Sequence, residues 1–499
     1  MNIIHTSYEG GTIYIYPFEF YDGLSANCCK AARDGFSQHI ATFLAAMNEI
    51  NRRQSMYNAA TGVGPVQSAV AARTDDALYR KVSRHIIPFL FICYVVSFLD
   101  RINIGFAQLQ MKQDLGFSDA MYGLGAAVFY IGYVLFEVPS NLLLAKYGAR
   151  KTFVRIMLLW GAASVSMAWV STPTQFYILR FALGVFEAGF FPGIVLYLTY
   201  WYPPLRRASV LSFFFAGVAV AGVLGGLVSG WIMRDMAGVM GMKGWQWMFA
   251  IEGAPALFLA VIAYFYLDDY PQDAKWLNKA EKAQLAANLG KDAVAVRSRP
   301  THKIAEWMAN PRIYLFAFIY FALTCGSLTL NFWMPLMIRD FGVKDVVLVS
   351  LYSVIPNAIG AVGVILIARV ADRKAQHGKY FACCTVGGAI ALALLTTHPS
   401  SLVVALGLLS VAAALIFAAL PIFWAIPSSH LPVEGRAGGI ALISSCGITS
   451  GIVAPWAIGH IKTATGSMDN ALYILAVLLV LSAVVLLTGL SRHSKGAAQ

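Results

Sequence analysis

The chain has 499 residues, of which 58% are hydrophobic and 12% are charged, with a formal net charge of +12. Soluble domains carry about twice that charged fraction, so the composition excludes an ordinary soluble domain. The positive charge would suggest nucleic-acid binding in a soluble protein, but basic residues of membrane proteins gather in cytoplasmic loops, and we expect no nucleic-acid partner.

The first part of the chain, residues 1–84, contains no apolar run long enough to cross a bilayer and no pattern of a cleaved signal peptide. We therefore expect 1–84 to be a disordered cytoplasmic tail. Residues 1–55 differ in character from the rest, and Met56 could serve as an alternative start. Residues 1–55 are thus either a genuine extension or an artefact of the gene start.

Twelve apolar segments follow, each about as long as a bilayer span requires. They predict an all-α membrane protein with a six-helix half at 85–267, a polar cytoplasmic connector at 268–312, a second six-helix half at 313–490 and a cytoplasmic tail at 491–499. The expected spans lie near 86–106, 119–145, 153–171, 175–200, 207–232, 247–267, 313–338, 347–371, 380–397, 401–426, 436–460 and 470–490.

Lysine and arginine favour one side of this alternating pattern. The long connector is basic, as are the turns around Lys146–Lys151 and Arg373–Lys379, whereas the opposite loops are poorer in basic residues. Because cytoplasmic loops carry the excess of basic residues, both termini and the connector should be cytoplasmic. We therefore expect a multi-pass membrane protein with this orientation.

Four ionisable residues lie inside otherwise apolar spans: Asp100 and Arg101 in the first, Arg180 and Glu187 in the fourth. Each costs roughly 2.5–3.5 kcal/mol near the bilayer centre. Four isolated charges would cost on the order of 10–14 kcal/mol, about the whole stability of a typical protein. They must therefore pair, line water or take part in function. Buried acids beside buried bases indicate proton-coupled transport of a charged solute.

The helical rise gives the expected depths of these charges. Counted from His85, Asp100 lies about 22 Å along the first span, and Arg180 lies about 9 Å below the outer surface, with Glu187 about 10 Å deeper. Consecutive side chains diverge by about 100° around a helix, so Asp100 and Arg101 should face different partners. We expect Asp100 to meet Arg180 and Arg101 to face the cavity.

These placements suggest roles. Arg101 offers a planar fork for a substrate carboxylate. Glu187 is the first candidate for the proton carrier, and Asp100, gated by Arg180, is the second. The simpler alternative is that the charges only lock the first and fourth helices together.

Several strings over about 80–499 resemble the anion:cation symporter family of the major facilitator superfamily, the group of bacterial organic-acid permeases. They are Ser97-Phe98-Leu99-Asp100-Arg101, Phe136-Glu137-Val138-Pro139-Ser140-Asn141, Gly244-Trp245-Gln246-Trp247, Ile251-Glu252-Gly253 and Pro271-Gln272-Asp273-Ala274-Lys275. Within this family the chain is most similar to the branch that moves tartrate, phthalate and hydroxyphenylacetate. The resemblance implies two six-helix halves and a monomer in the bacterial inner membrane. It also implies proton-coupled import of a small organic anion, functional roles for the four charges, and a substrate contact at Tyr133.

The chain also departs from the family. Val218, Ser444 and Ile448 stand where sugar-acid relatives carry polar side chains. With fewer donors for hydroxyl groups, the site should prefer an aromatic or short dicarboxylic acid over a sugar acid. Weaker candidates for substrate contact are Trp424, Asn331 and Ser444, each of which could instead serve helix packing.

The sequence thus predicts a proton-coupled symporter for a small organic anion. A proton-coupled exporter of metabolites or drugs and a transporter-like sensor remain alternatives, and sodium could replace the proton. No motif for a nucleophile, a nucleotide or a metal is evident, so we expect no enzymatic activity, no cofactor and no metal.

Overall fold

The computed structural model describes residues 6–9, 12–15, 65–297, 310–374, 376–430 and 436–496. At the N-terminus, β1 (Thr6–Glu9) and β2 (Thr12–Ile15) form an antiparallel pair in which Thr6 faces Ile15. Most of the predicted tail, residues 16–64, lies outside the described residues. Helix α2 begins at Pro65, so the expected boundary at residue 84 falls within a helix. Residues 65–84 include four alanines and three arginines, and these good helix formers extend the first span backwards.

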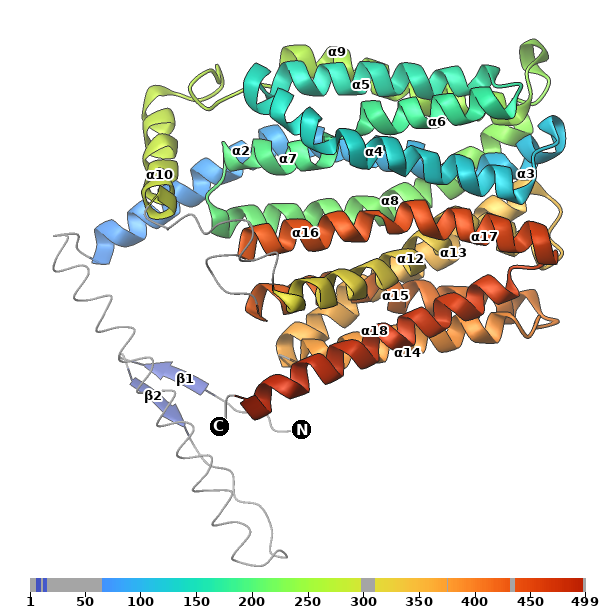
Figure 1. The fold of residues 1–499 in the computed structure, drawn as a ribbon. Coiled ribbons are helices and arrows are strands. Elements are labelled where there is room, and N and C mark those ends of the chain that lie inside the picture. The colour runs from blue at the N-terminus through green and yellow to red at the C-terminus, as the bar shows by residue number, and fades with distance from the viewer. Residues whose placement is uncertain are drawn as a thin grey trace, which may run out of the picture. The chain divides into compact units, whose positions relative to one another are not determined.

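Helices α2 to α9 form the first half, in the upper part of the bundle in Figure 1. Their bounds are α2 (Pro65–Ile102), α3 (Ile104–Leu115), α4 (Asp119–Tyr147), α5 (Ala149–Ser166), η1 (Met167–Trp169), α6 (Pro173–Glu187), α7 (Phe190–Thr199), α8 (Pro204–Asp235), η2 (Val239–Gly241) and α9 (Gly244–Tyr266).

Helix α10 (Lys279–Arg297) lies in the connector, whose residues 298–309 are outside the described part. The second half follows, in the lower part of the bundle in Figure 1. Its helices are α12 (Pro311–Asp340), α13 (Val346–Lys374), α14 (His377–Leu395), α15 (Leu402–His430), α16 (Arg436–Ile448), α17 (Ser450–Thr465) and α18 (Asp469–Gly496).

Eleven segments of the described chain are long and apolar enough to cross a membrane. The 32-residue helix α8, which lies between the fourth and fifth of these segments, completes a set of twelve. The protein is therefore an all-α membrane protein with two six-helix halves, as the sequence predicted.

Three spans are interrupted. The first continues from α2 through Asn103 into α3 and reaches Leu115, beyond the predicted end near 106. The fourth breaks directly after Glu187, where Gly189 adopts a positive φ of 84° before α7 starts. The eleventh breaks between α16 and α17. Interrupted spans are where transporters commonly place their substrate and ion sites.

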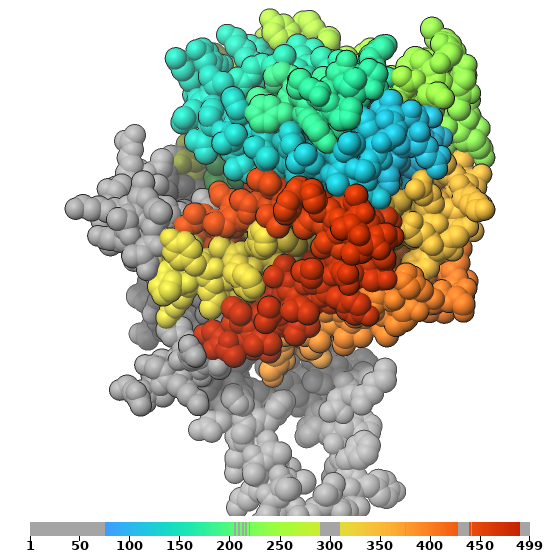
Figure 2. Space-filling view, turned by 45° about the vertical axis from the view of Figure 1, so that its right-hand side comes forward, coloured from blue at the N-terminus to red at the C-terminus, as the bar shows by residue number. Residues whose placement is uncertain are grey.

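The two halves pack through α4 against α17 and through α8 against α13. Small residues allow the approach: a Cβ atom on Gly123 of α4 would lie 2.3 Å from the carbonyl oxygen of Pro455 on α17. Figure 2 shows the surface of α17, in red, lying against the blue surface of α3 and α4.

Candidate functional site

A buried ion pair joins the first and fourth spans. The Arg101 Nη2 atom donates to Glu187 Oε1 at 2.5 Å, and the Ser97 hydroxyl donates to the same oxygen at 2.7 Å. The Glu187 side chain is fully buried, whereas that of Arg101 is 15% exposed. The second carboxylate oxygen, Oε2, is buried without a hydrogen-bond partner. The arginine therefore forms the accessible side of the pair.

Close packing of α4 on α6 positions the pair. A Cβ atom on Gly184 would lie 2.0 Å from the carbonyl oxygen of Phe129, so only glycine allows this approach. Phe129 is thereby held beneath the guanidinium of Arg101, whose Cζ lies 5.5 Å from the ring centroid. The rings of Phe98 and Tyr133 lie at 5.3 Å and 5.1 Å from the same atom. Aromatic faces stabilise a desolvated cation and leave its edge free to donate.

Arg180, which lies seven residues before Glu187 on α6, is completely buried. Its Nε donates to the carbonyl oxygen of Gly125 at 3.2 Å, and its Cζ lies 4.9 Å from the centroid of Phe129. Its Nη1 and Nη2 atoms have no hydrogen-bond partner. A buried guanidinium whose two Nη atoms have no acceptor for their N–H groups is costly unless an anion or water accepts from them.

The predicted pairing of Asp100 with Arg180 is wrong. Asp100 accepts from Trp160 Nε1 at 2.8 Å, from Asn103 Nδ2 at 3.1 Å and from the Ser164 hydroxyl. It is 1% exposed and faces the interior of the first half. Arg101 pairs with Glu187 instead, so it does not face the cavity unpaired.

The length of the first span explains this error. The predicted span ended near residue 106, which placed Asp100 and Arg101 in the outer half of the membrane, above Glu187. The observed span continues to Leu115. Asp100 and Arg101 therefore lie farther from its end, and Arg101 reaches the level of Glu187.

The structure places the other predicted substrate-contact residues in different surroundings, and only one of them lies beside Arg101. Tyr133 is buried beside Arg101, where the sequence placed it. Trp424 is half-buried on α15 and packs on Tyr320 at 4.8 Å between ring centroids. Asn331 donates to the Ser327 carbonyl of its own helix at 2.8 Å, as a packing residue does. Ser444 is half-buried on α16, and its role stays a prediction.

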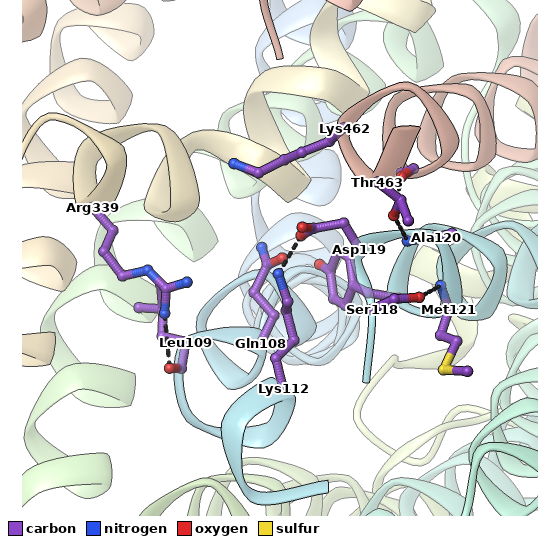
Figure 3. Close-up of polar contacts among 12 residues, drawn as sticks. Gln108, Leu109, Lys112, Ser118, Asp119, Ala120, Met121, Arg339, Lys462 and Thr463 are labelled. Atoms are coloured by element: carbon purple, nitrogen blue, oxygen red, sulfur yellow. Dashed lines mark hydrogen bonds and ion pairs between the residues drawn. The ribbon is translucent and has the colours of Figure 1, made fainter. Parts of the chain in front are cut away.

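The halves meet closely at the end of the bundle formed by α3, the start of α4, and the ends of α12 and α17, which we call the α3 end. Four hydrogen bonds cross between the halves there, and two of them, those of Arg339 and Ala120, can be followed in Figure 3. Gln108 Nε2 and the Tyr122 hydroxyl donate to the Phe332 carbonyl at 3.2 Å and 3.5 Å. Arg339 Nη1 donates to the Leu109 carbonyl at 3.0 Å, and the Ala120 amide donates to the Thr463 hydroxyl at 2.8 Å.

Two ion pairs at the α3 end lie within single halves, whereas the Arg339 guanidinium bonds across to a carbonyl oxygen. Lys112 pairs with Asp119 in the first half, and Lys462 pairs with Asp340 in the second. The four bonds that cross all end on uncharged acceptors. Those with an uncharged donor each contribute about 0.5–1.5 kcal/mol net, and the one from the Arg339 guanidinium contributes about 1.5–3 kcal/mol. Such bonds can break and form again as the two halves move relative to each other.

Several residues of the site escaped the sequence analysis. Ser97 lies one helical turn before Arg101, and Trp160 and Ser164 lie four residues apart in the third span. Polar groups at this spacing share one helix face, which was the available signal. Nothing in the sequence alone directs that face toward Asp100.

Comparison with known proteins places the chain in a family. Residues 90–455 match the Major Facilitator Superfamily. The chain is 42% identical over 427 residues to a "Putative tartrate transporter" of Agrobacterium vitis, covering 85% of this chain and 94% of that one. It is 39% identical over 423 residues to the "Putative metabolite transport protein NicT" of Pseudomonas putida, covering 84% and 97%.

Among solved structures, a bacterial homologue of the human lysosomal transporter Spinster superposes with a TM-score of 0.65 and 17% identity, covering 81% of this chain and 96% of that one. At that identity the similarity concerns the fold. The chain belongs to the major facilitator superfamily, and it is a multi-pass membrane transporter of a small molecule.

Proposed function

We propose that this transporter is a proton-coupled symporter that imports a small organic anion. The observation that carries the proposal is the ion pair between Arg101 and Glu187. A carboxylate is what a guanidinium binds best, and Glu187 occupies the position that a substrate carboxylate would take. The carboxylate of Glu187 and the carboxylate of the substrate therefore compete for the guanidinium of Arg101.

This competition supplies the coupling. When Glu187 is ionised, it holds Arg101, and a substrate anion would have to displace it. When Glu187 takes up a proton, the attraction is lost and Arg101 can bind the substrate carboxylate. Substrate and proton then bind together and leave together, which is the requirement for symport.

A second cation favours a short dicarboxylic acid. The Nη1 and Nη2 atoms of Arg180 have no protein partner, and Phe129 lies beneath both Arg180 and Arg101. One carboxylate on each arginine would satisfy both cations. The relative from Agrobacterium vitis is named for tartrate, which is a dicarboxylate. An aromatic monocarboxylate on Arg101, with its ring against Tyr133, is the alternative within the same class.

The proposed orientation places both termini and α10 in the cytoplasm of a bacterial cell, with the protein a monomer in the inner membrane. The α3 end then faces the periplasm. Its close packing makes this conformation the one in which the periplasmic path is closed, and the next step of the cycle would separate the halves at that end.

Uptake into proteoliposomes tests the proposal. Reconstituted protein receives labelled short dicarboxylates, aromatic acids and sugar acids, with an imposed pH gradient, a sodium gradient or neither. We expect a short dicarboxylic or aromatic acid to accumulate against its gradient only when protons flow inward. Accumulation that depends on sodium, or net efflux under the same proton gradient, would contradict the proposal.

A further inference from the structure

The interior of the first half contains two buried acids that the coupling scheme does not use. Glu252 on α9 is 2% exposed, and Asp100 on α2 is 1% exposed. The two acids are linked through Ser164. A Cβ atom on Gly253, the residue after Glu252, would lie 2.8 Å from the Ser164 hydroxyl oxygen, and that hydroxyl donates to Asp100.

The two acids differ in their hydrogen bonds. Asp100 accepts from three donors, Asn103, Trp160 and Ser164. An ionised carboxylate, which can only accept, is satisfied in such a place. Glu252 accepts at one oxygen only, from the Ser229 hydroxyl at 2.6 Å.

Two buried acceptors remain without a donor. They are Glu252 Oε2 and the side-chain oxygen Oδ1 of Asn103. Asn103 is 0% exposed and bonds to Asp100, which also accepts from Ser164, and Ser164 lies against Gly253, the residue next to Glu252. If Glu252 were ionised, neither oxygen could be satisfied by the other, because both only accept. A proton on Glu252 supplies the missing donor.

We infer that Glu252 holds a proton in this conformation and donates it to Asn103 Oδ1, while Asn103 Nδ2 donates to Asp100, so that the two acids and the amide form one unit with one proton. At neutral pH the chain takes up this proton from solvent on folding and releases it on unfolding. Asp100 is then the anion of the pair, and Glu252 is a positioning residue that acts on it through Asn103.

The charged surroundings fit one proton in this unit. Asp100 interacts electrostatically with Glu187 and Arg180 of α6, which bear opposite charges. Glu252 interacts in the same way with Asp100. Ser229 of α8 and Trp160 of α5, which also contact the unit, are uncharged. Two ionised carboxylates here would repel each other in a low-dielectric interior, whereas one anion and one neutral acid do not.

Infrared spectroscopy of the purified protein tests the inference without measuring transport. Wild-type protein at neutral pH should show the carbonyl stretch of an undissociated carboxylic acid. The band should be lost in Glu252→Gln and retained in Asp100→Asn. Absence of the band in the wild type, or its persistence unchanged in Glu252→Gln, would overturn the inference.

Thermal unfolding in detergent gives a second readout. The native protein would hold a proton that the unfolded chain releases, so the wild-type melting temperature should fall relative to that of Glu252→Gln as the pH rises from about 5 to about 8. Parallel curves would overturn the inference, because a glutamate that is already ionised in the fold produces no such difference. Neither measurement depends on the substrate or the coupling ion, so this inference and the proposed function fail separately.

Discussion

The guanidinium of Arg101 lies 2.5 Å from the carboxylate of Glu187, and only the arginine side of this pair is exposed. A buried pair of this kind is costly to break from one side, because removing one partner leaves an uncompensated charge, at about 3–5 kcal/mol. In the proposed mechanism a proton takes the place of Arg101 at Glu187, and a substrate carboxylate takes the place of Glu187 at Arg101. The pair thus accounts for the presence of Arg101 and Glu187 in the membrane, and the proposed mechanism assigns both of them a use.

Replacing Arg101 by lysine tests its role as the anion anchor. An ammonium keeps the charge but lacks the planar fork that binds a carboxylate through two hydrogen bonds. One lost charge-assisted bond of about 1.5–3 kcal/mol weakens binding by roughly 10–100-fold. Arg101→Lys should show this loss in a detergent binding assay while remaining folded, as judged by its elution at the wild-type position in size-exclusion chromatography. Unchanged affinity in folded protein would remove Arg101 from the substrate site.

Enlarging Gly123 tests whether the α3 end must close during transport. A side chain there would meet the Pro455 carbonyl of the other half, 2.3 Å from its Cβ. Gly123→Leu should therefore insert normally but lose transport by at least an order of magnitude. Gly407 is the matched control, since nothing lies within 4 Å of its Cβ position. Equal transport by Gly123→Leu and Gly407→Leu would show that this contact is not needed.

Competition for uptake tests the substrate class. Unlabelled short dicarboxylic or aromatic acids should inhibit uptake of the identified substrate, whereas galactonate or glucarate should inhibit it much less. A site built around hydroxyl groups would reject acids that lack them by about 10⁴–10⁵-fold, and this site should not. Tight, selective transport of galactonate or glucarate would contradict the prediction and leave the fold and the coupling scheme untouched.

The number of spans could be predicted because apolar runs of about 20 residues carry a strong signal. The importance of the four charges followed from the cost of burying them. Their pairing did not follow, because it depends on depth, and α3 extends the first span beyond its predicted end to Leu115. An error of a few residues in a helix boundary displaces a side chain by several ångströms along the helix, enough to change its partner.

Glu252 illustrates a different limit. Its string Ile251-Glu252-Gly253 was visible, but a single acid near the start of the sixth span indicates neither its partner nor its protonation. The partners come from Ser229 on α8 and from Asn103 between α2 and α3, which are far apart in the sequence. Only the packing of these helices brings together the two acceptors that need one proton.

The most direct test of the account compares wild-type protein with Glu187→Gln in proteoliposomes. The amide resembles the protonated acid, so it should leave Arg101 free to bind substrate but cannot release or regain a proton. The account predicts that Glu187→Gln loses uphill accumulation driven by a pH gradient and still exchanges labelled for unlabelled substrate across the membrane. Uphill accumulation by Glu187→Gln at the wild-type level would contradict it.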